Sequence, residues 1–373
     1  MILNFAEALA ALGPNAAARI ANGARPPANY LFNTFLPERA MPDYTVRAAN
    51  MIVRSTMAGL VAMDSPYPPT GAVDISTFFE QAAKLGAQSR LTEEALRHLQ
   101  NLVRNFQVSG TLSNDFLQRE ALNFLNKTVV QSLMDTSEWL RGQALVNGAI
   151  SWTFNGMALA VDYGIPTTHK LTTRTDSSND AYFDSASAFW ADVVAARQLL
   201  KYNLRAAVLN SRTLDDIIGN SANSVSIIGQ NSGSIQLRRW KSVNGVNMPD
   251  DDVRYTVNFI IYDEEAEVLD TDNPGKTETV KFMPDGKILF VGNPGRAGYR
   301  VGSGSTDDPA DNLELGYHHI APTTENGGNP GRWARLYTPE AFPMQLQAEG
   351  VSNELPVLLN PSAVVIATTE LSS

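Results

Sequence analysis

The chain has 373 residues, which is too long for most single hydrophobic cores, so two or three domains are expected. Its formal net charge of −10, and the lack of a basic cluster larger than Arg238-Arg239, exclude a general nucleic-acid-binding protein. The absence of cysteine excludes disulfides and sites that depend on a thiolate.

No apolar run approaches the roughly 18 residues that a membrane-spanning helix needs. No basic segment followed by an apolar segment marks a secretory signal. We therefore expect a soluble protein made in the cytoplasm. Charged residues make up 18% of the chain, below the usual quarter, and such a low share is compatible with surface that becomes buried between subunits.

Residues 1–49 are predicted to be an arm, because short apolar groups alternate with helix breakers. A helix from Ile2 to Leu12 is expected to end at Gly13-Pro14. The aromatic residues Tyr30, Phe32 and Phe35 follow in an irregular stretch. A monomer would cover them with its own core, whereas an oligomer could cover them with a neighbouring subunit.

Residues 50–90 are predicted to form a long hairpin. Its first limb runs from Ile52 to Met63, its tip is rich in proline, and its second limb runs from Val73 to Phe79. The prolines stiffen the tip, because each fixes φ. An ordinary surface hairpin with a long loop is the alternative interpretation.

A helix is expected from Thr92 to about Phe106, with acids in its first turn. A longer helix over 114–146 follows, with an apolar stripe at i, i+3, i+4 and i+7 spacing. It should end at Asn147-Gly148, a suitable C-terminal cap. A helix of this length spans about 50 Å, which suggests a strut rather than part of a small domain.

The next segment mixes strands and helices. Asn155-Gly156 lies between two apolar runs and predicts a β-hairpin. Residues 172–180 are a polar linker, and a helix (189–204), a strand (206–209) and a second helix (213–218) follow it.

Strands dominate the rest of the chain. Residues 255–262 form the clearest strand, and 280–282 with 288–291 are predicted to pair as a hairpin. The last strands, between 334 and 367, are expected to return and pair with the 150–162 hairpin.

Candidate chemical sites are weak. His318-His319 would point to opposite faces of a strand, and no third metal ligand lies at useful spacing. Asp270–Gly275 resembles the start of a calcium loop but lacks its closing glutamate. Arg238-Arg239 and Asp250–Asp252 are interpreted as solvated strand ends and turns. We predict no catalytic residues, cofactor or metal, and no enzyme activity.

Three segments carry a resemblance to a known family. The first is Leu140–Gly148, followed by 150–154; the second is 190–213; the third comprises 341–344 and 358–365. In their order these segments resemble the major capsid proteins of tailed bacteriophages, and most closely the lambda-type phage major capsid protein E family of the HK97 fold. The resemblance extends over nearly the whole chain.

The resemblance implies an α+β HK97-like fold with five parts. These are an N-terminal arm (1–49), an extended E-loop hairpin (50–90), a peripheral P-domain (91–171) with a spine helix (114–146), an axial A-domain (172–333), and returning P-domain strands (334–373). It also implies hexamers and pentamers that form an icosahedral shell around double-stranded DNA in the virion. The implied partners are further copies of the chain, a scaffolding protein and a portal, with a decoration protein as a further candidate. Binding of specific DNA sequences is not implied.

Some HK97-fold shells are crosslinked through a hairpin lysine, but residues 51–83 contain no lysine. We therefore predict non-covalent locking. The predicted contacts between subunits are Tyr30, Phe32, Phe35, Tyr67, Phe78 and Phe79, and deletion of residues 1–49 should prevent assembly of an otherwise folded subunit. An encapsulin-like compartment, and a β-rich metal-dependent hydrolase that uses His318 or His319, remain as alternatives.

Overall fold

The structure is a computed structural model, and it describes most of the chain. The described residues are 15–54, 72–98 without 96, 114–154, 157–174, 181–293 without 202, 232, 245, 251 and 270–275, then 314–338 and 345–371. The predicted helix Ile2–Leu12, the hairpin tip, most of the Thr92–Phe106 helix and the Asp270–Gly275 loop lie outside these residues.

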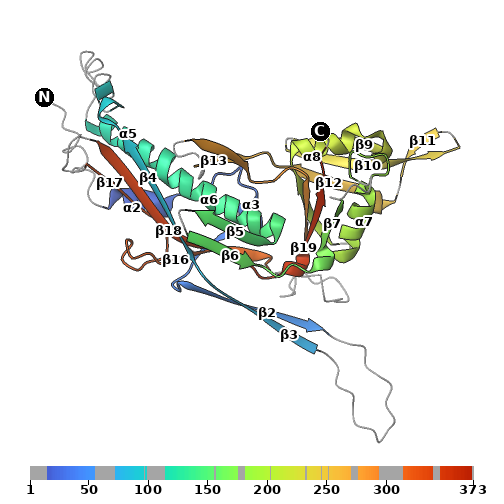
Figure 1. Ribbon diagram of the computed structural model, residues 1–373, viewed down its shortest axis with the longest axis horizontal. Coiled ribbons are helices and arrows are strands. Elements are labelled where there is room, and N and C mark those ends of the chain that lie inside the picture. The colour runs from blue at the N-terminus through green and yellow to red at the C-terminus, as the bar shows by residue number, and fades with distance from the viewer. Residues whose placement is uncertain are drawn as a thin grey trace, which may run out of the picture.

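A long helix crosses one half of the molecule (Figure 1). It is continuous through four segments: α5 (Asn114–Leu125), η1 (Asn126–Val130), α6 (Gln131–Gly142) and η2 (Gln143–Asn147). The η1 and η2 segments are π-helical. Gly148 then adopts a φ of 69°, a left-handed conformation that ends the helix. The predicted spine helix is therefore confirmed, and none of the described helices is long and apolar enough to cross a membrane.

The first sheet packs against this helix. It contains the strands β1 (Glu38–Ala40), β4 (Ala83–Leu91), β16 (Gly316–Ala321), β17 (Trp333–Tyr337) and β18 (Leu346–Leu358). β18 is central, because it pairs antiparallel with β16, β17 and β4. The apolar stripe of the helix, including Leu125, Val129, Leu133 and Leu140, is buried in the core beneath it.

The second sheet forms the other half of the molecule. Its strands follow the order β11 (Val246–Pro249), β10 (Ser234–Val243), β12 (Thr256–Ile261), β8 (Leu204–Leu209), β15 (Lys287–Gly292), β19 (Val364–Thr369) and β7 (Lys170–Arg174), with β9 (Val225–Asn231) paired to β10. Helices α7 (Phe189–Leu199) and α8 (Ser211–Gly219) belong to this half. Phe189, Phe259 and Phe290 lie in its core.

Short helices complete the fold. They are α2 (Ala16–Gly23), α3 (Phe32–Phe35), and the 3-10 turns η3 (Thr167–His169), η4 (Ser221–Asn223), η5 (Val253–Tyr255) and η8 (Pro361–Ala363). Asn210 caps the start of α8: its Oδ1 accepts a hydrogen bond from Thr213 N at 2.9 Å.

Three pairs of strands form two-stranded ribbons that do not pair with either large sheet. They are β2 (Thr45–Arg54) with β3 (Ala72–Gln81), β5 (Ala149–Phe154) with β6 (Met157–Asp162), and β13 (Glu265–Leu269) with β14 (Thr277–Lys281). The β2–β3 ribbon projects away from the body (Figure 1). The predicted hairpin at 150–162 is therefore present. For the predicted hairpin at 50–90, β2 and β3 pair, while residues 55–71 lie outside the described residues.

Two predicted strand pairings are wrong. β14 and β15 do not form a hairpin, because β14 pairs with β13 while β15 lies between β8 and β19. Residues 288–291 are buried on both faces, which suits a central strand, whereas most of β14 is exposed. The closing strands also do not pair with the β5–β6 ribbon: β18 joins the first sheet, and β19 joins the second.

The strands that make up each sheet also differ from the expected division of the chain into domains. β16 lies in the first sheet, although 172–333 was predicted to be one axial domain. β19 lies in the second sheet, although 334–373 was predicted to return to the peripheral domain. β4, at the end of the predicted hairpin segment, is part of the first sheet. Long-range strand pairing, and not order along the chain, therefore separates the two halves.

One glycine allows the spine helix to lie close to the sheet. A Cβ on Gly350 of β18 would come within 2.4 Å of Val129 Cγ1 and 3.3 Å of Leu133 Cδ1. By contrast, a Cβ on Gly86, in the neighbouring strand β4, would meet nothing within 4 Å.

We expect Gly350→Ala to lower the free energy of unfolding by about 1–3 kcal/mol, because the added methyl group overpacks the contact between helix and sheet. Gly86→Ala is the matched control and should leave stability unchanged or slightly raised. Urea unfolding of the purified subunits measures both. Equal stability of the two variants would contradict the close packing.

Candidate functional site

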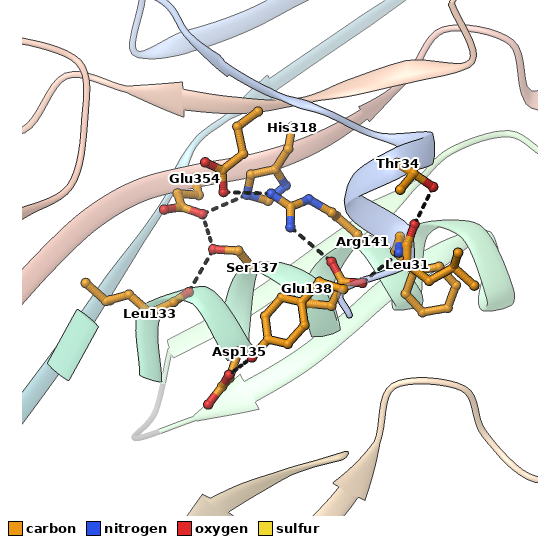
Figure 2. A network of polar contacts seen from close by, with 12 residues as sticks. Leu31, Thr34, Leu133, Asp135, Ser137, Glu138, Arg141, His318 and Glu354 are labelled. Atoms are coloured by element: carbon orange, nitrogen blue, oxygen red, sulfur yellow. Dashed lines mark hydrogen bonds and ion pairs between the residues drawn. The ribbon is translucent and has the colours of Figure 1, made fainter. Parts of the chain in front are cut away.

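The most unusual site in the structure is a buried ionic network. Among the described residues, no three His, Asp or Glu side chains gather as metal ligands. Instead, charged groups from the arm, the spine helix and the first sheet meet in the protein interior (Figure 2). The candidate site is therefore one that fixes the relative positions of these elements.

Helix α6 supplies three members of the network. Ser137, Glu138 and Arg141 are fully buried, because their spacing places them on the face that packs on the sheet. Glu138 Oε2 lies 3.1 Å from Arg141 Nη1. Its other oxygen, Oε1, accepts hydrogen bonds from Phe32 N at 2.7 Å and from Tyr262 Oη at 2.9 Å. Glu138 thus joins the spine helix to both α3 and the second half of the chain.

The arm contributes Glu38, on the short strand β1. This strand is parallel to β16, with Glu38 opposite His318. The Glu38 carboxylate accepts hydrogen bonds from Arg141 Nη2 at 2.9 Å and from Arg332 Nη2 at 2.6 Å. One carboxylate therefore bridges two arginines that come from the helix and from the loop before β17.

The first sheet supplies the central acid, Glu354 of β18. Arg332 Nε donates to its Oε1 at 2.8 Å, and His318 Nε2 lies 2.7 Å from its Oε2. Ser137 and Ser352 donate to the same carboxylate. Glu354 is completely buried, so these four partners take the place of water.

The network is electrostatically uneven, since it contains three carboxylates and two guanidinium groups. Burial alone would raise the pKa of Glu354, but Arg332 and the hydrogen bond from His318 outweigh it and hold that pKa well below its usual range. For Glu38, burial is likewise outweighed by the hydrogen bond and charge of Arg332, so its pKa is lowered. Burial dominates at Glu138 and raises its pKa despite Arg141.

His318 is held in its neutral form. Burial and the positive charge of Arg141 lower its pKa to about 4, against the opposing hydrogen bond to Glu354. Its Nδ1 has no hydrogen-bond partner in the part of the chain that the structure describes. A proton added there would therefore lack an acceptor, and the neutral ring donates through Nε2 to Glu354.

Three of the predicted inter-subunit contacts are instead core residues of this subunit. Tyr30 is 6% exposed, Phe32 0% and Phe35 5%. Phe32 packs edge-on against Tyr262, with ring centroids 5.0 Å apart, and Tyr30 packs edge-on against Phe282. The prediction that a neighbour covers these three side chains is wrong, because the subunit's own chain already does so.

The remaining predicted contacts stay untested. Tyr67 lies outside the described residues, as do the side chains of Phe78 and Phe79 on β3. They remain predictions for the projecting ribbon.

The adjacent histidines alternate as expected for a strand. His318 faces Glu354, whereas His319 Nε2 lies 2.8 Å from the carbonyl oxygen of Asp43. The prediction of a solvated turn at Asp250 was wrong, because Asp250 is buried and lies 2.6 Å from Arg239 Nη2. Arg239 itself keeps 31% of its side chain exposed.

Sequence reasoning missed the network itself, although one signal was present. Ser137 and Arg141 follow Leu133 at intervals of four, so they occupy core positions of the apolar stripe on the spine helix. A charge at such a position indicates a buried partner. That the partners are Glu38, Arg332 and Glu354 could not be inferred from their positions along the chain.

Together, the long helix on a five-stranded sheet, the second mixed sheet and the projecting ribbon define an HK97-like capsid fold. A model of the family described as phage major capsid protein E matches residues 17–369. The chain therefore belongs to this family, and it is a shell-forming capsid protein.

Solved structures are similar in fold and distant in sequence. A prophage protein of E. coli CFT073, described as a capsid protein, matches with a TM-score of 0.54 and 10% identity over 99% of this chain and 100% of that chain. The encapsulin of Synechococcus elongatus PCC 7942 has a TM-score of 0.44 and 10% identity over 93% and 90% of the two chains. A protein of Mycobacterium phage Patience has a TM-score of 0.41 and 9% identity, over 93% of this chain and 89% of that chain. No curated protein matches the chain.

We expect Arg332→Met to lower the free energy of unfolding by about 3–5 kcal/mol, because it leaves the buried carboxylate of Glu354 without its arginine partner and removes one of the two arginines that bind Glu38. Arg335→Met is the matched control. Arg335 pairs with Glu349 at the surface, and its loss should lower stability by less than about 1 kcal/mol. Urea unfolding at pH 7 compares the variants, and similar losses would show that the network does not stabilise the subunit.

The lowered pKa of His318 also predicts that acid destabilises the fold. The unfolded chain binds a proton at His318 below its ordinary pKa of about 6.5, whereas the folded chain binds it only near pH 4. The stability that the neutral His318 contributes to the fold is therefore complete above pH 6.5 and is lost as the pH falls toward 4. Between pH 7 and pH 5, the free energy of unfolding should fall by about 2 kcal/mol.

Urea unfolding at these two pH values tests this expectation. The lowered pKa values of Glu38 and Glu354 act mainly below pH 4.5, and the raised pKa of Glu138 would add stability as the pH falls, so a loss of stability in this interval reports on His318. His318→Gln should flatten the pH dependence, while His98→Gln, a change at an exposed residue, should preserve it. An unchanged slope in His318→Gln would show that folding does not lower the pKa of His318.

Proposed function

We propose that this chain assembles into hexamers and pentamers that form an icosahedral shell around double-stranded DNA, and that the β2–β3 ribbon of each subunit lies on a neighbour. The observation that carries this proposal is the ribbon itself. It forms a separate two-stranded sheet within the described residues and extends away from the body (Figure 1).

A ribbon of this kind needs a partner. Isolated two-stranded hairpins are marginally stable in water. The register places Met51 opposite Ile75 and Val53 opposite Val73, two apolar pairs near the described end of the ribbon. Burial against a neighbouring subunit would contribute roughly 25 cal/mol for each Å² of apolar area. The same contact would order the ribbon and hold the shell together.

The arm has a different role from the one that the sequence suggested. Tyr30, Phe32, Phe35 and Glu38 stabilise the subunit that carries them. Deletion of residues 1–49 would therefore remove part of the core and the network, and would unfold the subunit. In this proposal residues 1–14 are the part of the arm that remains for contacts with neighbours.

The proposed partners follow from the shell. Further copies of the chain come first, then a scaffolding protein and a portal during assembly in the host cytoplasm, with a decoration protein as a further candidate. The net charge of −10 disfavours adhesion to packaged DNA, because like charges repel. The role is structural and not enzymatic, and subunits are locked non-covalently because residues 51–83 lack lysine.

We expect that replacing residues 55–71 with Asn-Gly will prevent shell assembly without changing the thermal stability of the subunit. Arg54 and Ala72 stand opposite each other in register, so a two-residue turn can close the shortened ribbon. Electron microscopy of purified protein measures assembly, and thermal unfolding measures stability. Normal shells from this variant would overturn the role of the ribbon.

The same operation on another ribbon provides the control. Replacing residues 270–276 with Asn-Gly shortens the β13–β14 ribbon between Leu269 and Thr277, which also stand opposite each other. This variant should still assemble.

Wild-type particles purified from lysed host cells should protect DNA from nuclease, whereas protein cargo in place of DNA would favour the encapsulin-like compartment.

A further inference from the structure

The β2–β3 ribbon is continuous along the chain with two strands of the first sheet. Residues 41–44 join β1 to β2 and form the corner through which the chain leaves the sheet. Ala82 alone joins β3 to β4 and forms the corner through which the chain returns. The conformation of these two corners therefore sets the direction in which the ribbon projects from the body (Figure 1).

Two contacts hold the outgoing corner on strand β16. Met41 N donates a hydrogen bond to the carbonyl oxygen of Ile320 at 2.9 Å. Two residues further along the chain, the carbonyl oxygen of Asp43 lies 2.8 Å from His319 Nε2. A carbonyl oxygen only accepts, so Nε2 carries a proton and donates this hydrogen bond. The corner is thus tied to one strand by a backbone hydrogen bond and by a side chain.

His319 lies on the face of β16 opposite to the buried ionic network. Neighbouring residues of a strand point to opposite faces, and His318 points into the network. The His319 side chain belongs to a residue that is only 2% exposed, and its ring centroid lies 6.3 Å from that of Tyr317 on the same face. Because buried side chains are closely packed, the ring has little freedom to move away from Asp43.

The returning corner is buried as well. Ala82 is 3% exposed, and its N–H donates a hydrogen bond to the carbonyl oxygen of Tyr44 at 3.2 Å, which joins the two corners. Val46, the second residue of β2, is 1% exposed and belongs to the hydrophobic core. The root of the ribbon is therefore part of the rigid body, whereas within the described chain β2 and β3 pair only with each other.

We propose that His319 is a positioning residue: by holding the carbonyl oxygen of Asp43, it fixes the direction in which the β2–β3 ribbon leaves the subunit. The ten residues of β2 span about 33 Å, so a rotation of about 10° at the root would move the far end by about 6 Å. Such a displacement exceeds the reach of a hydrogen bond. This inference rests on the proposed shell function and adds the residue that aligns the ribbon with its neighbour.

Distances between two spin labels test the proposal in the unassembled subunit. The chain has no cysteine, so labels can be attached at Asn50→Cys, midway along β2, and at Ser132→Cys, exposed on α6. The distance distribution should have one maximum in this background. His319→Phe keeps an aromatic ring without the donor and should broaden the distribution about twofold or shift its maximum. His319→Gln should restore it, because the amide nitrogen can donate to Asp43.

His169 provides a matched control. It is 8% exposed, and its Nδ1 lies 2.9 Å from the carbonyl oxygen of Val364, so His169→Phe also removes a buried ring from a backbone carbonyl oxygen. This variant should lose thermal stability as His319→Phe does, yet leave the label distances unchanged. An unchanged distribution in His319→Phe, or equal broadening in both phenylalanine variants, would overturn the positioning role.

Assembly connects this role to the shell. His319→Phe should raise the protein concentration needed for shells about tenfold, whereas His169→Phe and His319→Gln should leave it unchanged. Normal assembly by His319→Phe would overturn the inference and leave the shell function standing. Absence of shells from the wild-type chain would instead overturn the shell function, while the label distances would still report whether His319 directs the ribbon.

Hydrogen exchange of the wild-type subunit applies if the histidine variants do not fold. The amides of Met41 and Ala82 donate hydrogen bonds at the two corners. They should exchange as slowly as those of β16, whereas the amides in the projecting half of β2 should exchange faster, because only the root belongs to the rigid body. Fast exchange at both corners would show that the root is not held and would overturn the proposal.

Discussion

The carboxylate of Glu354 holds together elements that lie far apart in the chain. It is buried, and its hydrogen bonds come from Ser137, His318, Arg332 and Ser352. Removing a charge from water is unfavourable unless partners replace the hydration shell. The spine helix, β16, β18 and the loop before β17 must therefore keep one arrangement. Glu38 extends the same requirement to the arm, because it binds Arg141 and Arg332. Glu138 does so as well, because it binds Arg141 and accepts a hydrogen bond from Phe32 N.

This constraint separates the parts of the chain that belong to the subunit from those that extend beyond it. Phe32 donates its backbone N–H to Glu138 and packs on Tyr262, so the described arm is part of the core. The β2–β3 ribbon forms a sheet of its own and projects from the body. A buried network is specific because each missing partner leaves a charge unpaired. A rigid body that carries an extended ribbon suits a subunit whose contacts with neighbours must recur many times in a shell.

Local structure was largely predictable because it depends on nearby residues. The apolar stripe and Gly148 marked the spine helix and its end. Asn155-Gly156 marked the β5–β6 ribbon, and the resemblance in the order of segments pointed to the capsid family that the match over residues 17–369 confirms. The aromatic residues of the arm were recognised as buried, but sequence alone could not tell whether their own subunit or a neighbour covers them. Periodicity reports that a face is buried and not what buries it.

The sequence by itself therefore determined the spine helix, helices α7 and α8, the β5–β6 ribbon and the capsid class, since these follow from patterns within short segments and from their order. Only the tertiary structure decided which strands pair: β15 lies between β8 and β19, and β18 lies among β4, β16 and β17. It also decided that Glu38, Arg141, Arg332 and Glu354 meet. Strand pairing and ion pairing join residues hundreds of positions apart, and the free energy of such contacts depends on packing and burial that no single segment contains.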